Sequence, residues 1–165
     1  MTTTTEPKID ERPSQPYMGI RRQTPMKGMG KQVEKMLKAL AAWVSRSGVQ
    51  AAGSPFLRYY VIDMEGQMDI EVGVPVTAPL PEDGEVCPGE LPAGRYASLV
   101  YVGSGLTGNK TLLDWAWANG LRWDRWKDPH GDAFRARYET FLTDPKDEPR
   151  KTKWQIEVAI KLADA

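Results

Sequence analysis

The chain repeats itself, and an internal repeat constrains the architecture more strongly than any local pattern of residues. Three short strings recur in the same order: residues 11–17 (E-x-P-x-x-x-Y) as 90–96 and Arg58-Tyr59 as Arg137-Tyr138, each 79 residues later, and residues 70–72 (I-E-V) as 156–158, 86 residues later. We therefore interpret residues 7–76 and 85–162 as two copies of one structural unit. The seven extra residues of the second copy are expected in a loop near residues 144–149.

Hydrophobic periodicity predicts the content of each copy. Apolar residues follow a helical period over residues 30–47, and a second helix is expected to have Asn109 as N-cap and to end at Asn119-Gly120. Four segments are typical of strands: 56–63, 68–76, 96–102 and 154–162, the first two joined by a turn at Glu65-Gly66. The prediction is an α+β fold in which a duplicated β-β-α-β-β unit forms an antiparallel sheet of about eight strands. Both helices are expected on one face, with a ligand cleft at the pseudo-two-fold axis.

The charge balance and the scarcity of metal-binding residues exclude several classes of protein. The chain has 22 Lys and Arg against 22 Asp and Glu, which is not the basic surplus that a nucleic-acid-binding protein needs. One His and one Cys form neither an intrachain disulfide nor a zinc site, so we expect no metal and no cofactor. No signal peptide and no apolar run of membrane-spanning length is present. We therefore expect a single cytoplasmic domain over residues 1–165, without direct nucleic-acid binding.

Two glutamates, Glu71 and Glu157, occupy equivalent positions in the two copies. Because neighbours along a strand point to opposite faces, both are expected to face away from the side that packs on the helices. Gly73 and Ala159 follow on the same face, and such small side chains leave room beside a carboxylate. One interpretation is a cleft with two acids at its base. The other is a pair of ordinary solvent-facing glutamates.

Aromatic residues are the second candidate component of a binding site. The candidate hydrogen-bond donors are Tyr59, Tyr60, Tyr101 and Tyr138, and the candidate walls of the cleft are Trp115, Trp123 and Trp126. Trp117 and Trp154 fit the apolar sides of their helix and strand, and the alternative for all these rings is that most belong to the core. A carboxylate surrounded by aromatic rings suits a flat, apolar or cationic molecule.

Three segments carry a resemblance to a known family: residues 68–76 (M-D-I-E-V-G-V-P-V), 115–120 (W-A-W-A-N-G) and 154–158 (W-Q-I-E-V). In these segments the chain resembles the GyrI-like family of small-molecule-binding domains, which also form the effector-binding domains of some AraC-type and multidrug-responsive transcription regulators. The resemblance extends over residues 7–162. It implies a hydrophobic, aromatic-lined cleft in which Glu157, and by symmetry Glu71, faces the ligand.

Some stand-alone proteins of this family are hydrolases that open the strained cyclopropane of DNA-alkylating natural products, and the resemblance implies such a detoxifying activity here. Glu157 or Glu71, without a cationic partner and with a raised pKa, is then the general base toward water, while Tyr138 or Tyr101 donates to the carbonyl of the ligand. The alternative is a non-catalytic effector-binding or drug-sequestering module for aromatic cations. A third interpretation is a protein interaction such as inhibition of gyrase. The segment before the first helix leaves no room for an additional helix-turn-helix.

Overall fold

A computed structural model describes residues 1–164. The elements are β1 (Thr3–Thr4), β2 (Lys8–Arg12), β3 (Gln15–Pro25), α1 (Met29–Ser47), β4 (Phe56–Ile62), β5 (Gln67–Pro75), β6 (Cys87–Leu91), β7 (Gly94–Val102), α2 (Gly105–Ala118), β8 (Arg125–Asp128), β9 (Gly131–Phe134), β10 (Arg137–Phe141), the 3-10 helix η1 (Lys151–Lys153) and β11 (Ile156–Lys161). The four segments predicted as strands correspond to β4, β5, β7 and β11, and the first predicted helix is α1.

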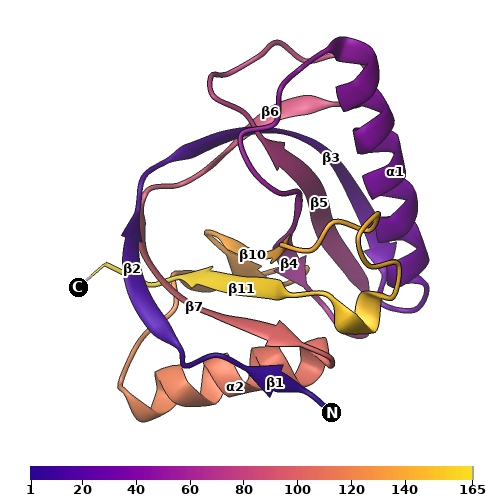
Figure 1. The fold of residues 1–165 in the computed structure, drawn as a ribbon. Helices are drawn as coiled ribbons and strands as arrows, with labels where there is room; N and C mark the ends of the chain where they lie inside the picture. The colour runs from indigo at the N-terminus through magenta and orange to yellow at the C-terminus, as the bar shows by residue number, and fades with distance from the viewer. Residues whose placement is uncertain (165) are drawn as a thin grey trace.

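The strands form one sheet, and each of its ladders is antiparallel. The main order is β1-β7-β11-β10-β4-β5-β3-β6, with β2 also on β7 and with β9 pairing both β4 and β8. This order is symmetric about the junction of β10 and β4, because β7-β11-β10 on one side matches β3-β5-β4 on the other. The sheet curls, and both helices lie outside the curl (Figure 1). The predicted α+β fold, with its antiparallel sheet and two helices, is confirmed.

The ladder registers show how the two copies correspond. Tyr17 on β3 pairs with Pro75 on β5, and Tyr96 on β7 pairs with Lys161 on β11. The two tyrosines are 79 residues apart and their strand partners are 86 residues apart. Both offsets found in the sequence therefore describe the same structural equivalence. The first strand of each copy lies on the other copy, because β2 pairs with β7 and β6 pairs with β3. The two halves are thus joined along their edges as well as at β4 and β10.

One of the three sequence matches is a coincidence. Arg58 pairs with Glu71, whereas Thr140 is the residue that pairs with Glu157, so Thr140 and not Arg137 is the counterpart of Arg58. Arg58 also lies directly opposite Tyr138 across the β4–β10 ladder, which places these two on the same face of the sheet. Arg137, one residue earlier, therefore points to the opposite face.

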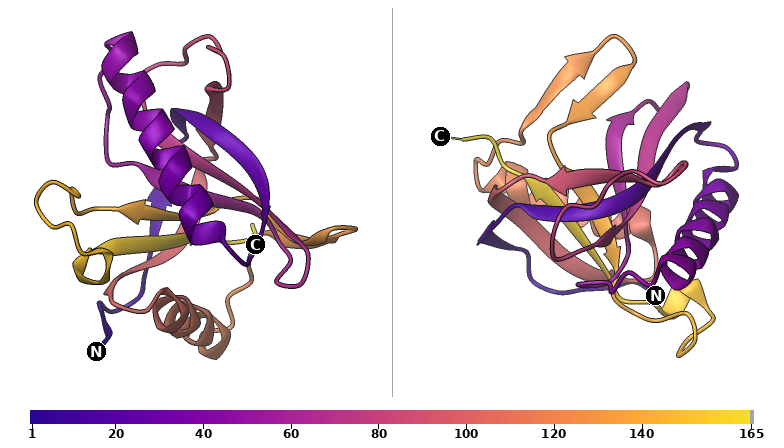
Figure 2. Two further views of the ribbon diagram at one scale, coloured as in Figure 1. Left: turned by 90° about the vertical axis from the view of Figure 1, so that its right-hand side faces the viewer. Right: turned by 90° about the horizontal axis from the view of Figure 1, so that it is seen from above.

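The second copy also departs from the predicted boundaries. Helix α2 begins at Gly105 with Ser104 as its N-cap, five residues before the position of the expected cap, Asn109. Glycines weaken the helical signal there, yet a Cβ at Gly108 would lie only 2.5 Å from the ring of Tyr101, so glycine lets the helix approach β7. After this helix, residues 125–134 form the β8–β9 hairpin, which projects from the body of the sheet in the right-hand view of Figure 2.

The helices and the sheet share one apolar core. Helix α1 buries Val33, Met36, Leu40 and Trp43, and α2 buries Leu112, all in one cluster with alternate side chains of the strands. Trp117 was expected on this apolar side but is 87% exposed, because α2 presents Leu112 and Ala116 to the sheet instead. Within residues 1–164, neither helix is long and apolar enough to cross a membrane.

Candidate functional site

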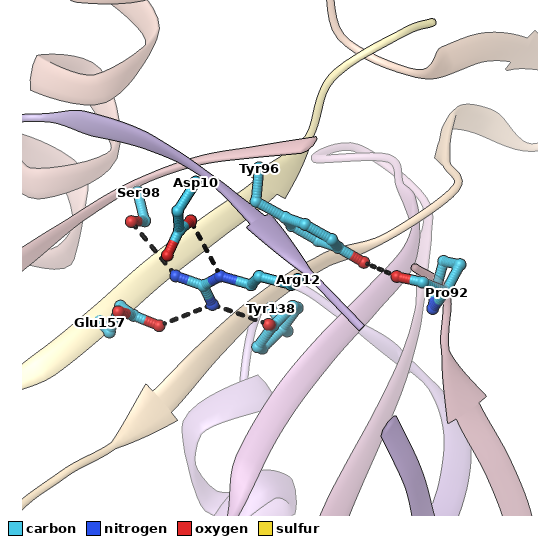
Figure 3. Close-up of polar contacts among 7 residues, drawn as sticks. All are labelled: Asp10, Arg12, Pro92, Tyr96, Ser98, Tyr138 and Glu157. Atoms are coloured by element: carbon cyan, nitrogen blue, oxygen red, sulfur yellow. Dashed lines mark hydrogen bonds and ion pairs between the residues drawn. The ribbon is translucent and has the colours of Figure 1, made fainter. Parts of the chain in front are cut away.

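Glu157 lies inside the curl of the sheet, where it forms an ion pair with Arg12 from β2 (Figure 3). Nη1 of Arg12 donates to Glu157 Oε1 at 3.0 Å and to the Tyr138 hydroxyl at 2.9 Å. The same guanidinium donates to Asp10 and Ser98 through its other nitrogens. The expectation of a glutamate without a cationic partner is therefore wrong for Glu157. Its partner comes from β2, a strand that reaches this face only because it pairs with β7 of the other copy.

Glu71 is almost fully buried and is held by tyrosine hydroxyls. It accepts hydrogen bonds from Tyr17 and, at 2.7 Å, from Tyr60. The Tyr17 hydroxyl in turn accepts a hydrogen bond from Nη1 of Arg58 at 2.9 Å, so one hydroxyl connects a carboxylate to a guanidinium. Arg21 covers the outer side, with its guanidinium carbon 3.6 Å from the centre of the Tyr60 ring. This arrangement neutralises charge within the protein and leaves the carboxylate no open approach.

Gly73 and Ala159 do not create free space beside the glutamates. A Cβ at Gly73 would lie 2.5 Å from the Phe56 ring, because rings of this chain fill the volume that the small side chains leave. Ala159 is fully buried in the same cluster, whose aromatic members are Tyr17, Phe56, Tyr96 and Tyr138. A hollow of about 300 Å³ remains at the edge of this cluster, bordered by Arg12 and Tyr138.

The face of the sheet that carries the helices holds a third acid, Glu139 on β10. Its side chain is only 9% exposed, and it accepts hydrogen bonds from the hydroxyls of Tyr59, at 3.0 Å, and of Tyr101. Burial, followed by the nearby Glu139 charge, raises the pKa of both tyrosines well above their ordinary value, so both stay protonated donors at neutral pH. No Lys, Arg or His nitrogen in residues 1–164 lies within ion-pair distance of Glu139.

A hollow of about 470 Å³ opens next to this carboxylate, and we call it the Glu139 hollow. It lies at the beginnings of both helices, since Met29 and Gly105 border it. A smaller pocket of about 80 Å³ shares Glu139, Tyr59 and Tyr101 with it. Four of the seven methionines line the hollow: Met26, Met29, Met64 and Met68. Methionine side chains are unbranched and polarizable, so they adapt to ligands of different shapes.

The residues predicted to form one site lie on two opposite faces of the sheet in the structure. Tyr59 and Tyr101 lie at the Glu139 hollow, whereas Tyr60 and Tyr138 lie on the opposite face of the sheet, with Glu71 and Glu157. Of the three tryptophans, Trp126 is half exposed beside a hollow of about 490 Å³ that also contains Arg58 and Tyr60. Trp115 and Trp123 are partly buried against the main core.

Glu139 itself was missed by the sequence analysis, although a signal for it exists. In β10, residues 137, 139 and 141 point to the face that packs on the helices, and the first two are charged. A charge at a core-facing position is costly to bury unless it has polar partners, so such a residue is a candidate functional residue. The segment was too short to show this alternation before its strand was known.

Comparisons with known proteins support the fold. The sequence matches the model of the GyrI-like small molecule binding domain over residues 5–163. No curated protein matches it.

Three solved structures share the fold at low identity. EcmrR, in the cryo-EM structure of its complex with DNA, matches with a TM-score of 0.72 at 14% identity, and the match covers 97% of this chain but 58% of the EcmrR chain. A hydrolase from Listeria innocua matches with a TM-score of 0.62 at 13% identity, covering 96% and 92% of the two chains. SAV2435 bound to tetraphenylphosphonium matches with a TM-score of 0.57 at 8% identity, covering 96% and 94%.

Proposed function

Because the chain belongs to the GyrI-like family of small-molecule-binding domains, we propose that it binds hydrophobic aromatic small molecules in the Glu139 hollow. The observation that carries this proposal is a buried carboxylate with two tyrosine donors at the side of an open, methionine-lined hollow. Apolar pockets with a few convergent polar groups are the usual form of a small-molecule site. The protein SAV2435, which shares the fold, was solved with tetraphenylphosphonium, and this supports an aromatic, hydrophobic ligand without deciding its charge.

Apolar side chains and Glu139 are expected to make different contributions to ligand binding in the hollow. The methionine and tyrosine side chains give apolar contact area to a flat ring system. Glu139 has unused acceptor capacity beyond the two tyrosine hydroxyls, so it accepts a hydrogen bond from an N–H or O–H of the ligand. A hydrogen bond to a charged group contributes about 1.5–3 kcal/mol, which corresponds to roughly ten-fold or more in affinity.

Fluorescence polarisation with rhodamine 110, a flat dye that carries amino groups, tests the proposal. Glu139→Gln is expected to weaken binding about ten-fold, because the neutral amide is a poorer acceptor and donates where the tyrosines also donate. Glu157→Gln and Glu71→Gln are the matched controls, since they remove the same charge on the opposite face of the sheet. The sequence-based prediction expects the reverse order of effects. Equal binding by wild type and Glu139→Gln would refute the proposed site.

We propose hydrolysis of a strained cyclopropane in DNA-alkylating natural products as a second candidate function, because Glu139 and Tyr101 are joined by a hydrogen bond. Glu139 accepts a proton from water as the water oxygen bonds to a ring carbon. The electrons of the broken carbon–carbon bond pass into the dienone, whose oxygen takes the proton of Tyr101. The hydrogen bond between the two side chains then returns the proton from Glu139 to the tyrosine, so both groups are regenerated.

A time course with substoichiometric protein and a spirocyclopropyl dienone tests this chemistry. Mass spectrometry is expected to show many equivalents of the water adduct per protein, and Glu139→Gln is expected to abolish the turnover while Glu157→Gln retains it. Depletion of the dienone that stops at one equivalent would refute catalysis and leave binding alone.

A further inference from the structure

The charges around the Glu139 hollow do not favour a simple organic cation. Among the described residues that line it, the ionised side chains are one acid, Glu139, and two bases, Arg137 and Lys151. The lining therefore carries a net positive charge. A lipophilic cation that approaches Glu139 is attracted by that one carboxylate but repelled by both bases.

Arg137 is the base most suited to bind a ligand. It lies two residues before Glu139 on β10, and the two side chains therefore point to the same face of the sheet. Its guanidinium lies over the ring of Phe134, 4.9 Å from the ring centre, and Nη2 donates to Asn109 Oδ1 at 2.9 Å. That is its one side-chain hydrogen bond within residues 1–164, and Nε is buried there without a partner.

The surroundings of Arg137 hold it in place without neutralising it. Asn109 is itself fixed, because its Nδ2 donates to the carbonyl oxygen of Gly105 at 2.9 Å. No carboxylate of residues 1–164 forms an ion pair with Arg137. Burial lowers the pKa of this guanidinium, and its effect exceeds the opposing effects of Tyr59 and Glu139. Arg137 is only partly buried, so its free donors can reach a ligand, and an anionic or strongly accepting group there forms a charge-assisted hydrogen bond.

The helices add to the same polarity. Met29 and Gly105, the first residues of α1 and α2, both border the hollow, so the positive ends of two helix dipoles meet there. Neither helix has an acidic residue in its first turn to offset this polarity. The two helix ends therefore reinforce the positive charge of Arg137 and Lys151.

From these observations we infer that the preferred ligand of the Glu139 hollow is an aromatic molecule with two polar ends, a donor that binds Glu139 and a carboxylate or similar oxygen anion that binds Arg137. This inference rests on the proposed binding function and specifies its ligand class. The site then discriminates against cations that lack the anionic end.

Two dyes that differ by one methyl group test the inference. Rhodamine 110 has a free carboxylate, and rhodamine 123 is its methyl ester with the same ring system and amino groups. Wild-type protein is expected to bind rhodamine 110 about ten-fold more tightly, as for one charge-assisted pair. Arg137→Met is expected to reduce this preference to less than about two-fold by weakening rhodamine 110 alone. Arg135→Met is the matched control, because Arg135 is exposed, lies over Trp126 and does not border the Glu139 hollow.

The outcomes separate the two proposals. Equal or tighter binding of rhodamine 123 by the wild type, or a ten-fold preference that survives in folded Arg137→Met, overturns the two-ended ligand while leaving the binding site intact. Binding of neither dye overturns the proposed function and this inference with it. Thermal unfolding of each variant establishes that it is folded, and the comparison of the dyes on wild type alone decides the matter if Arg137→Met does not fold.

Discussion

The buried tyrosines are expected to make the protein lose stability steeply as the pH rises into the alkaline range. The pKa values of Tyr17, Tyr59, Tyr96 and Tyr101 lie well above the ordinary value, and burial is the largest cause of the increase in each one. In the unfolded chain a tyrosine has a pKa of about 10. Below that pH both states hold the tyrosine protons, so these side chains add no pH dependence to the stability. Above it, the unfolded state loses protons that the folded state keeps, so stability falls as the pH rises toward the folded pKa values.

The size of this loss follows from proton linkage. For one tyrosine that stays protonated in the fold, ionisation of the unfolded chain lowers the free energy of unfolding by about 1.4 kcal/mol at about pH 11. These four tyrosines together remove about 6 kcal/mol. Native domains have only about 5–15 kcal/mol to lose. We therefore expect the protein to unfold cooperatively between about pH 11 and pH 12.

Urea denaturation followed by tryptophan fluorescence, at about pH 8 and about pH 11, measures the loss directly. The ultraviolet absorbance of tyrosinate is expected to rise in the same step as unfolding. Tyr101→Phe is expected to reduce the pH-dependent loss by about a quarter, because one of four equal contributions is gone. Tyrosinate that forms near about pH 10 while the protein is still folded would contradict the reasoning, since buried hydroxyls would then titrate as exposed ones do.

Three further substitutions have defined outcomes. Lys151→Met is expected to strengthen binding of the cationic ester rhodamine 123 roughly three-fold at low salt, because it removes one positive charge from the lining. Lys153→Met is the control and is expected to give no gain, since Lys153 lies outside the Glu139 hollow. Polarisation titrations at low and high salt measure both affinities. Arg12→Met is expected to lower the free energy of unfolding by about 2 kcal/mol, because two carboxylates and two hydroxyls lose their donor. Arg22→Met, at an exposed ion pair, is expected to change it by less than about 0.5 kcal/mol in the same urea assay. Gly89→Ala is expected to cost about 2 kcal/mol, because the new Cβ would lie 2.5 Å from a buried tyrosine ring, and an unchanged urea midpoint would refute this.

The sequence predicted those parts of the fold that depend on local pattern. The helical period of α1 and the alternation of Ile70, Val72 and Val74 describe their elements well, because each buries one continuous face. The spacing shared by the segments around Tyr17 and Tyr96 also identified a true structural equivalence, since both tyrosines hold the same position in their ladders.

The parts that could not be predicted depend on pairing across the chain. Arg12 reaches Glu157 only after β2 pairs with a strand about ninety residues away, and no local pattern contains that information. Likewise, Glu139 is a candidate binding residue only because Tyr59 and Tyr101, from two other strands, direct their hydroxyls to it. Local sequence patterns therefore predict Glu71 and Glu157 on one face of the sheet but do not reveal Glu139 on the other.

The position of β2 on β7 and of β6 on β3 has a consequence for how the chain folds and for how it could have arisen. Each half covers an edge of the other, as two subunits do when they exchange arms in a swapped dimer. An isolated half would expose an open strand edge and has nothing to pair with except another copy of itself. The two halves must therefore complete one another during folding, and the exchange makes the fused pair a single cooperative unit whose formation waits for its most distant contacts.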